Sequence, residues 1–201
     1  MSFFTAVLAS DGSLWRAKDV DVEECSSLDD LAELMREVSD GDHPALAIIE
    51  REDGWFGIVR VDGDEPAAVF VSDLAAVLEG HYAEILGAAA DVDVPVPAGV
   101  HAYDRHEQEE SEDERSEAQK AHDEEAVHDL EEALGGGSLL AADPDPEPTD
   151  TWAGDPSLLL DLGIGVADLV RIANDNPDDP ATALSAIAEI AGFAELIEAL
   201  R

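Results

Sequence analysis

The order of apolar segments predicts an α+β fold with a mainly antiparallel five-stranded sheet in the order ββαβββα. Three observations lead to this prediction: short strand-like runs joined by turn signals, two amphipathic helical stripes among them, and a concentration of acidic residues in the middle of the chain. Strands that follow one another through tight turns usually pair, which favours an antiparallel sheet. We expect the sheet domain to be followed by an acidic, disordered tether and a small C-terminal helical segment.

The first strands form a hairpin. Phe3 to Ala9 is rich in strand-forming residues, and a turn signal at residues 10–13 leads to a second extended run, Leu14 to Val22. Ser26 or Ser27 can then cap a helix. The apolar residues of this helix recur at helical spacing: Leu28, Leu31, Leu34, Met35 and Val38.

Three further strands and a second helix complete the predicted domain. Ala45 to Ile49 is continuously apolar, as in a strand covered on both faces, and turns separate it from Trp55 to Val61 and Ala67 to Val71. Ser72 can cap the second helix. Its apolar stripe contains Leu74, Val77, Leu78, Tyr82, Ile85 and Leu86. The order resembles that of profilin, longin and roadblock sheets, and by that analogy the last strand pairs with the first.

Charge divides the chain into three parts. Of 49 acidic and 10 basic residues, 18 acidic and 3 basic lie within residues 101–150, too polar a stretch to offset the entropy cost of ordering. We therefore predict an α+β domain at 1–98, a flexible Pro- and Gly-containing linker at 99–153, and a helical segment at 154–201. The last part is too small to be stable alone, so it docks on the first domain, on another copy or on a partner.

The C-terminal segment contains signals for short helices. Asp155-Pro156 and Asp179-Pro180 each combine a capping residue with the proline that suits a first helical position. Gly163 and Gly192 are typical helix ends. The helices are expected within Leu158 to Leu162, Val166 to Ala173, Leu184 to Ala191 and Phe193 to Leu200.

The net charge of −39 limits the kinds of molecule that the protein is expected to bind. It repels phosphate backbones and anionic lipids, so we expect no direct nucleic-acid or membrane binding, whereas a protein with a basic surface is attracted. Acidity as a solubility or proteome-wide adaptation is the open alternative. Cys25 is the only cysteine and the N-terminus lacks a signal-peptide pattern, so we expect a cytoplasmic protein.

No motif for catalysis, a cofactor or a metal is evident. Six histidines occur, four of them in or beside the acidic stretch, without zinc-site spacing: His43, His81, His101, His106, His122 and His128. His81, Tyr82 and Glu84 could form an acid–base group only if they faced a cleft. We predict no catalytic residue, no cofactor and no metal site.

Tryptophans are the candidate partner-binding residues. Trp15 and Trp55 lie in predicted strands, where core packing competes with recognition as an explanation. Trp152, between a Pro-rich spacer and Asp155, either pins the tether to the main domain or anchors a partner.

These residues resemble the bacterial family of tRNA adenosine deaminase-associated proteins. The resemblance rests on six segments: Phe3 to Leu8, Leu28 to Leu34, Trp55 to Gly63, Val69 to Asp73, Gly154 to Leu159 and Leu196 to Arg201. It implies association with the deaminase that converts adenosine to inosine at the tRNA wobble position. A deaminase needs a Pro-Cys-x-x-Cys zinc motif, which a chain with one cysteine cannot supply.

Four functions therefore stand as hypotheses. The leading one is a noncatalytic accessory or regulatory protein that acts in tRNA modification by protein–protein interaction with the deaminase. The alternatives are an acidic nucleic-acid mimic that inhibits an RNA-binding partner and a self-associating scaffold module, which would make the protein a homo-oligomer. An enzyme with an unrecognised site is a further possibility.

Overall fold

The computed structural model describes residues 3–12, 14–18, 22, 25–39, 43–52, 54–92 and 151–201. All of them belong to one compact unit made of residues 1–103 and 150–201. The predicted tether at 99–153 lies outside the described residues except for its last three.

The sheet is antiparallel throughout its described pairings and has six strands in the order β2-β1-β3-β4-β5-β6. This confirms the predicted α+β class with an antiparallel sheet. The strands are β1 Phe3–Ser10, β2 Trp15–Lys18, β3 Ala45–Arg51, β4 Phe56–Val61, β5 Ala68–Val71 and β6 Ala153–Gly154.

Two details of the predicted sheet need correction. Among the described residues the sheet has six strands instead of five, because residues 153–154 add β6 beside β5. The expected pairing of the last strand with the first is wrong, because both edges of β1 are taken by β2 and β3. The helix α1 (Leu28–Ser39) carries the chain past β1, and β4 and β5 then add outward by hairpins, away from β1.

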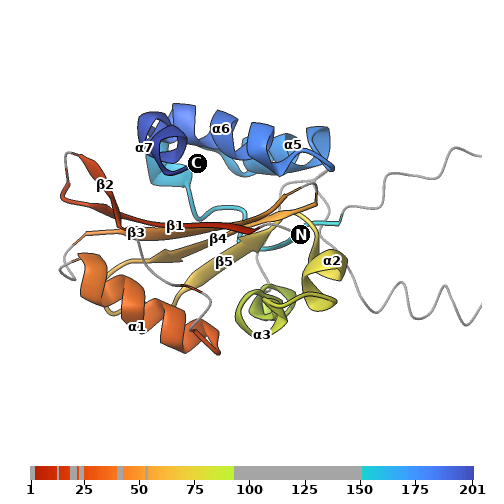
Figure 1. The fold of residues 1–201 in the computed structure, drawn as a ribbon, viewed down its shortest axis with the longest axis horizontal. Helices are drawn as coiled ribbons and strands as arrows, with labels where there is room; N and C mark the ends of the chain where they lie inside the picture. Colours follow the sequence, from red (N-terminus) through yellow and green to blue (C-terminus); the bar gives the residue numbers. More distant parts are fainter. Residues whose placement is uncertain are drawn as a thin grey trace, which may run out of the picture. The chain divides into compact units, whose positions relative to one another are not determined.

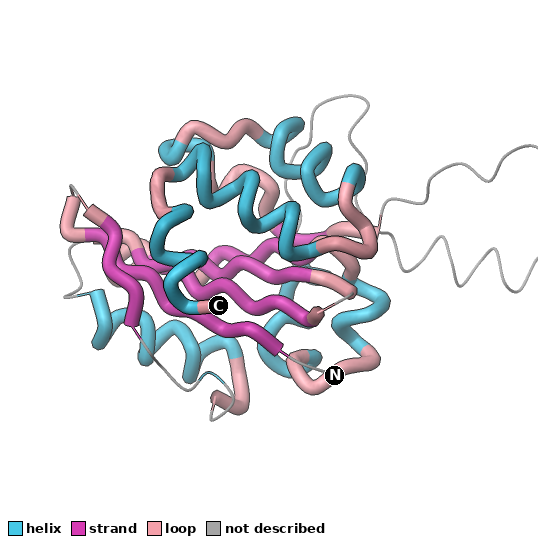
Figure 2. Tube along the Cα trace, turned by 45° about the horizontal axis from the view of Figure 1, so that its top comes forward, coloured by secondary structure: helices cyan, strands magenta, loops and turns pink. Residues whose placement is uncertain are grey.

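Helices cover both faces of the sheet (Figures 1 and 2). One face packs against α1, α2 (Leu74–Leu78), α3 (Ala83–Leu86) and the 3₁₀ helix η2 (Gly87–Asp91). The opposite face packs against the C-terminal elements, which are η3 (Leu160–Leu162), α5 (Val166–Asp175), α6 (Pro180–Ala191) and α7 (Ala194–Leu200).

Alternation along the strands explains how one sheet serves two cores. In β3, Ala47 and Ile49 belong to the cluster on the α1 face, whereas Leu46 and Ile48 belong to the cluster under the C-terminal helices. Successive side chains of a strand point to opposite faces, so a strand covered on both sides is apolar throughout, as predicted. Even Glu50 is buried, with 6% of its surface exposed.

Local signals at helix ends are confirmed in part. Ser27 accepts a hydrogen bond from the Asp30 N–H at 3.2 Å and caps α1. Asp179 caps α6 by accepting from Thr182 N–H at 3.0 Å, with Pro180 in the first position. Gly163 and Gly192 end their helices with φ of 86° and 82°.

Three expectations about helices are wrong in detail. The second helix is capped by Asp73, not Ser72, because the Asp73 carboxylate accepts from Ala76 N–H at 2.9 Å. That helix is divided into α2, α3 and η2, with Gly80 in the break. Asp155 caps no α-helix, since its carboxylate accepts from Ser157 N–H at 2.8 Å in a turn that leads only to η3.

The C-terminal segment docks on the sheet of its own chain, which is one of the three possibilities that the sequence left open. Arg60 of β4 holds it by donating hydrogen bonds to the Leu158 carbonyl at 2.7 Å and to both oxygens of Asp161. The hydrogen bonds from the Arg60 guanidinium to Asp161 lower the pKa of that carboxyl. At the other end, Arg201 pairs with Glu50 and lies 5.3 Å from the Phe4 ring centroid.

Candidate functional site

Two of the three predicted partner-binding tryptophans are core residues in this structure. Trp55 is 1% exposed and meets Tyr82 edge-on, with ring centroids 6.3 Å apart. Trp152 is 0% exposed and stacks on Phe70 of β5 at 5.7 Å. Trp152 thus fixes the start of the C-terminal segment to the sheet.

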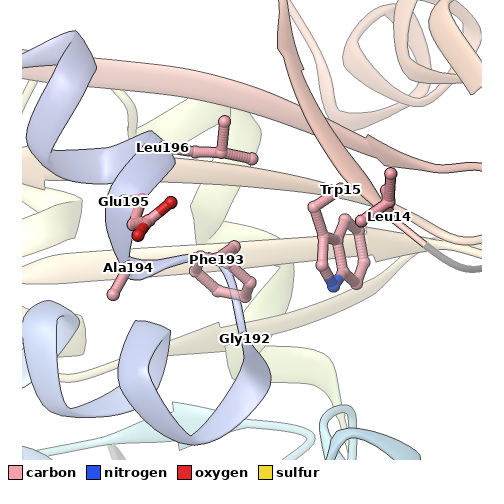
Figure 3. A pocket seen from close by; sticks show the side chains of 7 residues that line it. All are labelled: Leu14, Trp15, Gly192, Phe193, Ala194, Glu195 and Leu196. Carbon is pink, nitrogen blue, oxygen red and sulfur yellow. The ribbon is translucent and has the colours of Figure 1, made fainter.

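Trp15 is the half-buried member of the three, and it borders a surface hollow of about 370 Å³. Figure 3 shows Leu14 and Trp15 on the hairpin side, with the residues at the start of α7 opposite them. The hollow is lined by Leu14, Trp15, Gly192, Phe193, Ala194, Glu195 and Leu196. Trp15 and Phe193 meet edge-on, with their ring centroids 5.7 Å apart at an angle of 72°.

The turn between α6 and α7 positions one wall of this hollow. Gly192 takes a left-handed conformation at φ 82°, which glycine adopts without steric cost. The N–H groups of Gly192 and Phe193 both donate to the Ala188 carbonyl at 2.9 Å, which closes the end of α6. This turn places Phe193 against Trp15, where it is 2% exposed.

Leu14 forms the opposite wall and is the most unusual residue of the site. It is 66% exposed, the largest value among the exposed large apolar residues in the described part of the chain. The hairpin turn fixes its position, because Asp11 N–H donates to the Leu14 carbonyl at 3.1 Å and Leu14 N–H donates to the Asp11 carboxylate at 2.9 Å. An exposed leucine beside a half-buried tryptophan makes an apolar surface suited to a protein contact.

The other face of β2 is cationic. Arg16 and Lys18 are exposed and border a smaller hollow of about 90 Å³, together with Val38 and Ser39 of α1. Arg16 pairs with Asp11 at 2.7 Å, and the Arg16 side chain is still 70% exposed. The short strand β2 therefore has an apolar face and a basic face within a strongly acidic protein.

The sequence pointed to Trp15 but missed its neighbours in the hollow. Phe193 and Leu196 come from the far end of the chain, where the sequence pattern predicts only a helix. The sequence contains one indication that Leu14 is exposed. It is an apolar residue directly after a turn, and such a residue is not always buried in the core. The net charge of the chain does not reveal that Arg16 and Lys18 form a local basic patch on β2.

The candidate acid–base group does not come together. Tyr82 is buried, whereas His81 and Glu84 are exposed. The rings of His81 and Tyr82 are in edge contact at 5.1 Å. Neither of the two hollows described above is lined by any of the three.

For metal ligation, the structure describes only His43 and His81 among the six histidines, and the other four lie outside the described residues. Within the described ranges, no three or more His, Cys, Asp or Glu side chains are grouped so as to hold a metal ion. In the same ranges, no helix has the length and apolar character needed to cross a membrane.

Comparison with known proteins identifies the family of this chain. No curated protein and no solved structure matches the chain. A family model described as Rv3753c-like tRNA adenosine deaminase-associated protein matches residues 2–116. This range includes every described strand except β6 and all the helices on the α1 face. The chain belongs to the family of Rv3753c-like tRNA adenosine deaminase-associated proteins.

Proposed function

We propose that this protein is a noncatalytic accessory partner of tRNA adenosine deaminase and acts by binding that enzyme. Family membership carries the proposal, since the family is described as associated with the deaminase and not as the deaminase itself. The zinc deaminases have a Pro-Cys-x-x-Cys signature, and Cys25 is the only cysteine of this chain.

The contact surface in this proposal is the hollow between β2 and α7. Its apolar walls include Leu14 and Trp15, and Glu195 contributes a carboxylate among the lining residues. Protein interfaces commonly combine an aromatic or aliphatic anchor with a polar rim. A side chain of the deaminase that enters the hollow would cover Leu14 and the exposed part of Trp15.

Net charge supports a basic surface on the deaminase around this contact. A charge of −39 creates a field that speeds encounter with a partner of opposite potential. Salt screens such a field over about 8 Å at physiological ionic strength. Association is therefore expected to slow as salt rises, while the apolar contact itself is less sensitive to salt.

The test is direct binding of the purified full-length chain to the purified deaminase from the same genome. Calorimetry or size-exclusion chromatography at physiological salt should show a complex. Leu14→Asp should weaken binding at least about tenfold, because it places a charge in an apolar contact. Leu160→Asp is the matched control, since Leu160 is 55% exposed on η3 and does not line the hollow.

Two results would contradict the proposal in different ways. A wild-type chain that forms no complex across a wide concentration range would overturn the binding function. A complex that tolerates Leu14→Asp as well as Leu160→Asp would keep the binding function and exclude the hollow as its surface.

A further inference from the structure

The outer edge of β2 is open in the described part of the chain. β2 is the terminal strand of the sheet order, and its one strand partner there is β1. An edge strand presents backbone N–H and C=O groups that a strand from another protein can bind. The hydrogen bonds at the hairpin show which residues of β2 bond to β1 and which direct their backbone groups outward.

Two hydrogen bonds determine which pairs of residues in β1 and β2 are bonded to each other. Asp11 N–H donates to the Leu14 carbonyl, and Ser10 N–H donates away from β2, to the Pro44 carbonyl at 3.1 Å. Ser10 faces Trp15 and Leu8 faces Ala17 in the register. Because bonded and non-bonded pairs alternate in an antiparallel ladder, Trp15 and Ala17 direct their N–H and C=O groups outward.

Arg16 and Lys18 have the opposite role. They face Ala9 and Val7 in the register, at the positions where the alternation places bonds to β1. Their side chains lie on the α1 face, beside Val38 and Ser39. The side chains of Trp15 and Ala17 pack instead on the face covered by the C-terminal helices.

The charges of Arg16 and Lys18 limit which strands of another chain can pair with the edge of β2. If β2 of a second copy paired with it in an antiparallel register centred on Ala17, Arg16 would face Lys18 of that copy, and like charges directly opposite destabilise a sheet. Two chains of charge −39 also repel one another. A strand with acidic residues opposite Arg16 and Lys18 is complementary to the edge, and its apolar residue opposite Trp15 lies beside the hollow.

We infer that β2 binds one extended segment of the deaminase as a seventh strand, with alternating apolar and acidic side chains. This inference rests on the function proposed above and specifies its geometry. The apolar side chains of the segment lie on the hollow face, and its acidic side chains lie against Arg16 and Lys18. The basic surface that the overall field attracts then flanks this segment and is not part of it.

A proline substitution tests the backbone contact. Ala17→Pro removes an outward N–H and places a ring in the path of the added strand, while the bonds of Arg16 and Lys18 to β1 remain. It should weaken binding of the purified deaminase by at least about tenfold relative to the wild-type chain. Ala17→Ser keeps the N–H group and should bind like wild type. Lys18→Glu should weaken binding about fivefold by reversing one complementary charge.

Amide exchange gives a second measurement that needs no variant. In the wild-type complex, the amides of Trp15 and Ala17 should exchange more slowly, whereas those of Arg16 and Lys18, which already bond to β1, should change little. This measurement decides the matter if Ala17→Pro fails to fold, as judged by its circular dichroism spectrum and melting transition.

The outcomes separate the two proposals. If the wild-type chain does not bind the deaminase, the proposed function and this inference both fail. If it binds and Ala17→Pro binds equally well, or if Trp15 and Ala17 gain no protection, only the strand addition is overturned. If light scattering shows a dimer of the protein alone that Ala17→Pro dissociates, the edge pairs with a second copy and the inference is wrong.

Discussion

A single glycine allows the C-terminal segment to join the sheet. Gly154 in β6 has φ of 100°, and a Cβ atom added there would lie 2.1 Å from the Val69 carbonyl oxygen. Asp155 N–H donates to that same oxygen at 2.7 Å, so the close approach belongs to the pairing itself. No side chain can be added without moving the backbone of β5 or β6.

Gly154→Ala should therefore lower the free energy of unfolding by about 3 kcal/mol or more, combining the left-handed backbone cost with a backbone clash. Chemical denaturation followed by tryptophan fluorescence measures this difference. Gly192→Ala is the matched control, because Gly192 has φ of 82° but no atom within 4 Å of its added Cβ. It should cost only about 1 kcal/mol. If the two variants lose the same free energy of unfolding, the close contact with the Val69 carbonyl oxygen does not contribute to the cost of Gly154→Ala.

At the scale of elements, α6 presents two isoleucines to different surroundings. Ile187 is fully buried in the core between the sheet and the C-terminal helices, whereas Ile190 is 50% exposed. Both lie on the same helix, so their intrinsic helix propensity is the same and only burial differs.

We expect Ile187→Ala to destabilise the protein by about 3 kcal/mol, through lost burial and the cavity left behind. Ile190→Ala should change stability by less than about 0.5 kcal/mol. Urea unfolding of the two variants beside wild type tests this. A small loss for Ile187→Ala would mean that the C-terminal layer contributes little to the stability of the sheet.

The elements that sequence reasoning predicted well are those with strong local signals. β3 is a continuous apolar run because it is buried on both faces, and α6 begins at Asp179-Pro180 and ends at Gly192. β6 could not be predicted, because two residues carry no alternation and its pairing with β5 depends on a distant segment. The helix stripe from Leu74 to Leu86 gave the correct buried side but not the break near Gly80.

The site was less predictable than the fold, for the same physical reason. The sequence predicts Trp15 as a candidate partner-binding residue, but the surroundings of Trp15 depend on Phe193, which reaches it only after α7 packs on the hairpin. Burial of Trp55 and Trp152 likewise depends on long-range packing. Local sequence patterns predict elements and their faces, but not which distant side chains meet.

In the whole molecule, the hydrophobic core includes residues that lie outside the part matched by the family model. The family model matches residues 2–116, whereas the layer that covers one sheet face comes from residues 151–201. That face is apolar along β1, β3, β4 and β5. Its residues are Ala6, Leu8, Leu46, Ile48, Phe56, Ile58 and Phe70. One of the two faces of the sheet in the matched part is therefore buried by the C-terminal segment.

Because of this shared core, the peptide connection between the two parts should be dispensable once the chain has folded. A recognition sequence for a specific protease, inserted between Asp104 and Thr149, allows the connection to be cut in the folded protein. After cleavage, the two fragments should co-elute at micromolar concentration and unfold in one cooperative transition. The physical reason is that separation would expose the apolar sheet face, at about 25 cal/mol per Å².

Cleavage also makes association concentration-dependent, since it removes the effective concentration that the covalent connection provides. The cut form of Ile187→Ala should dissociate on dilution at concentrations where the cut forms of wild type and Ile190→Ala remain associated. Analytical ultracentrifugation over a dilution series measures all three. If the cut wild-type fragments separate and the N-terminal fragment stays folded with a cooperative transition of its own, the sheet does not need the C-terminal layer, and residues 151–201 are a separately docked element.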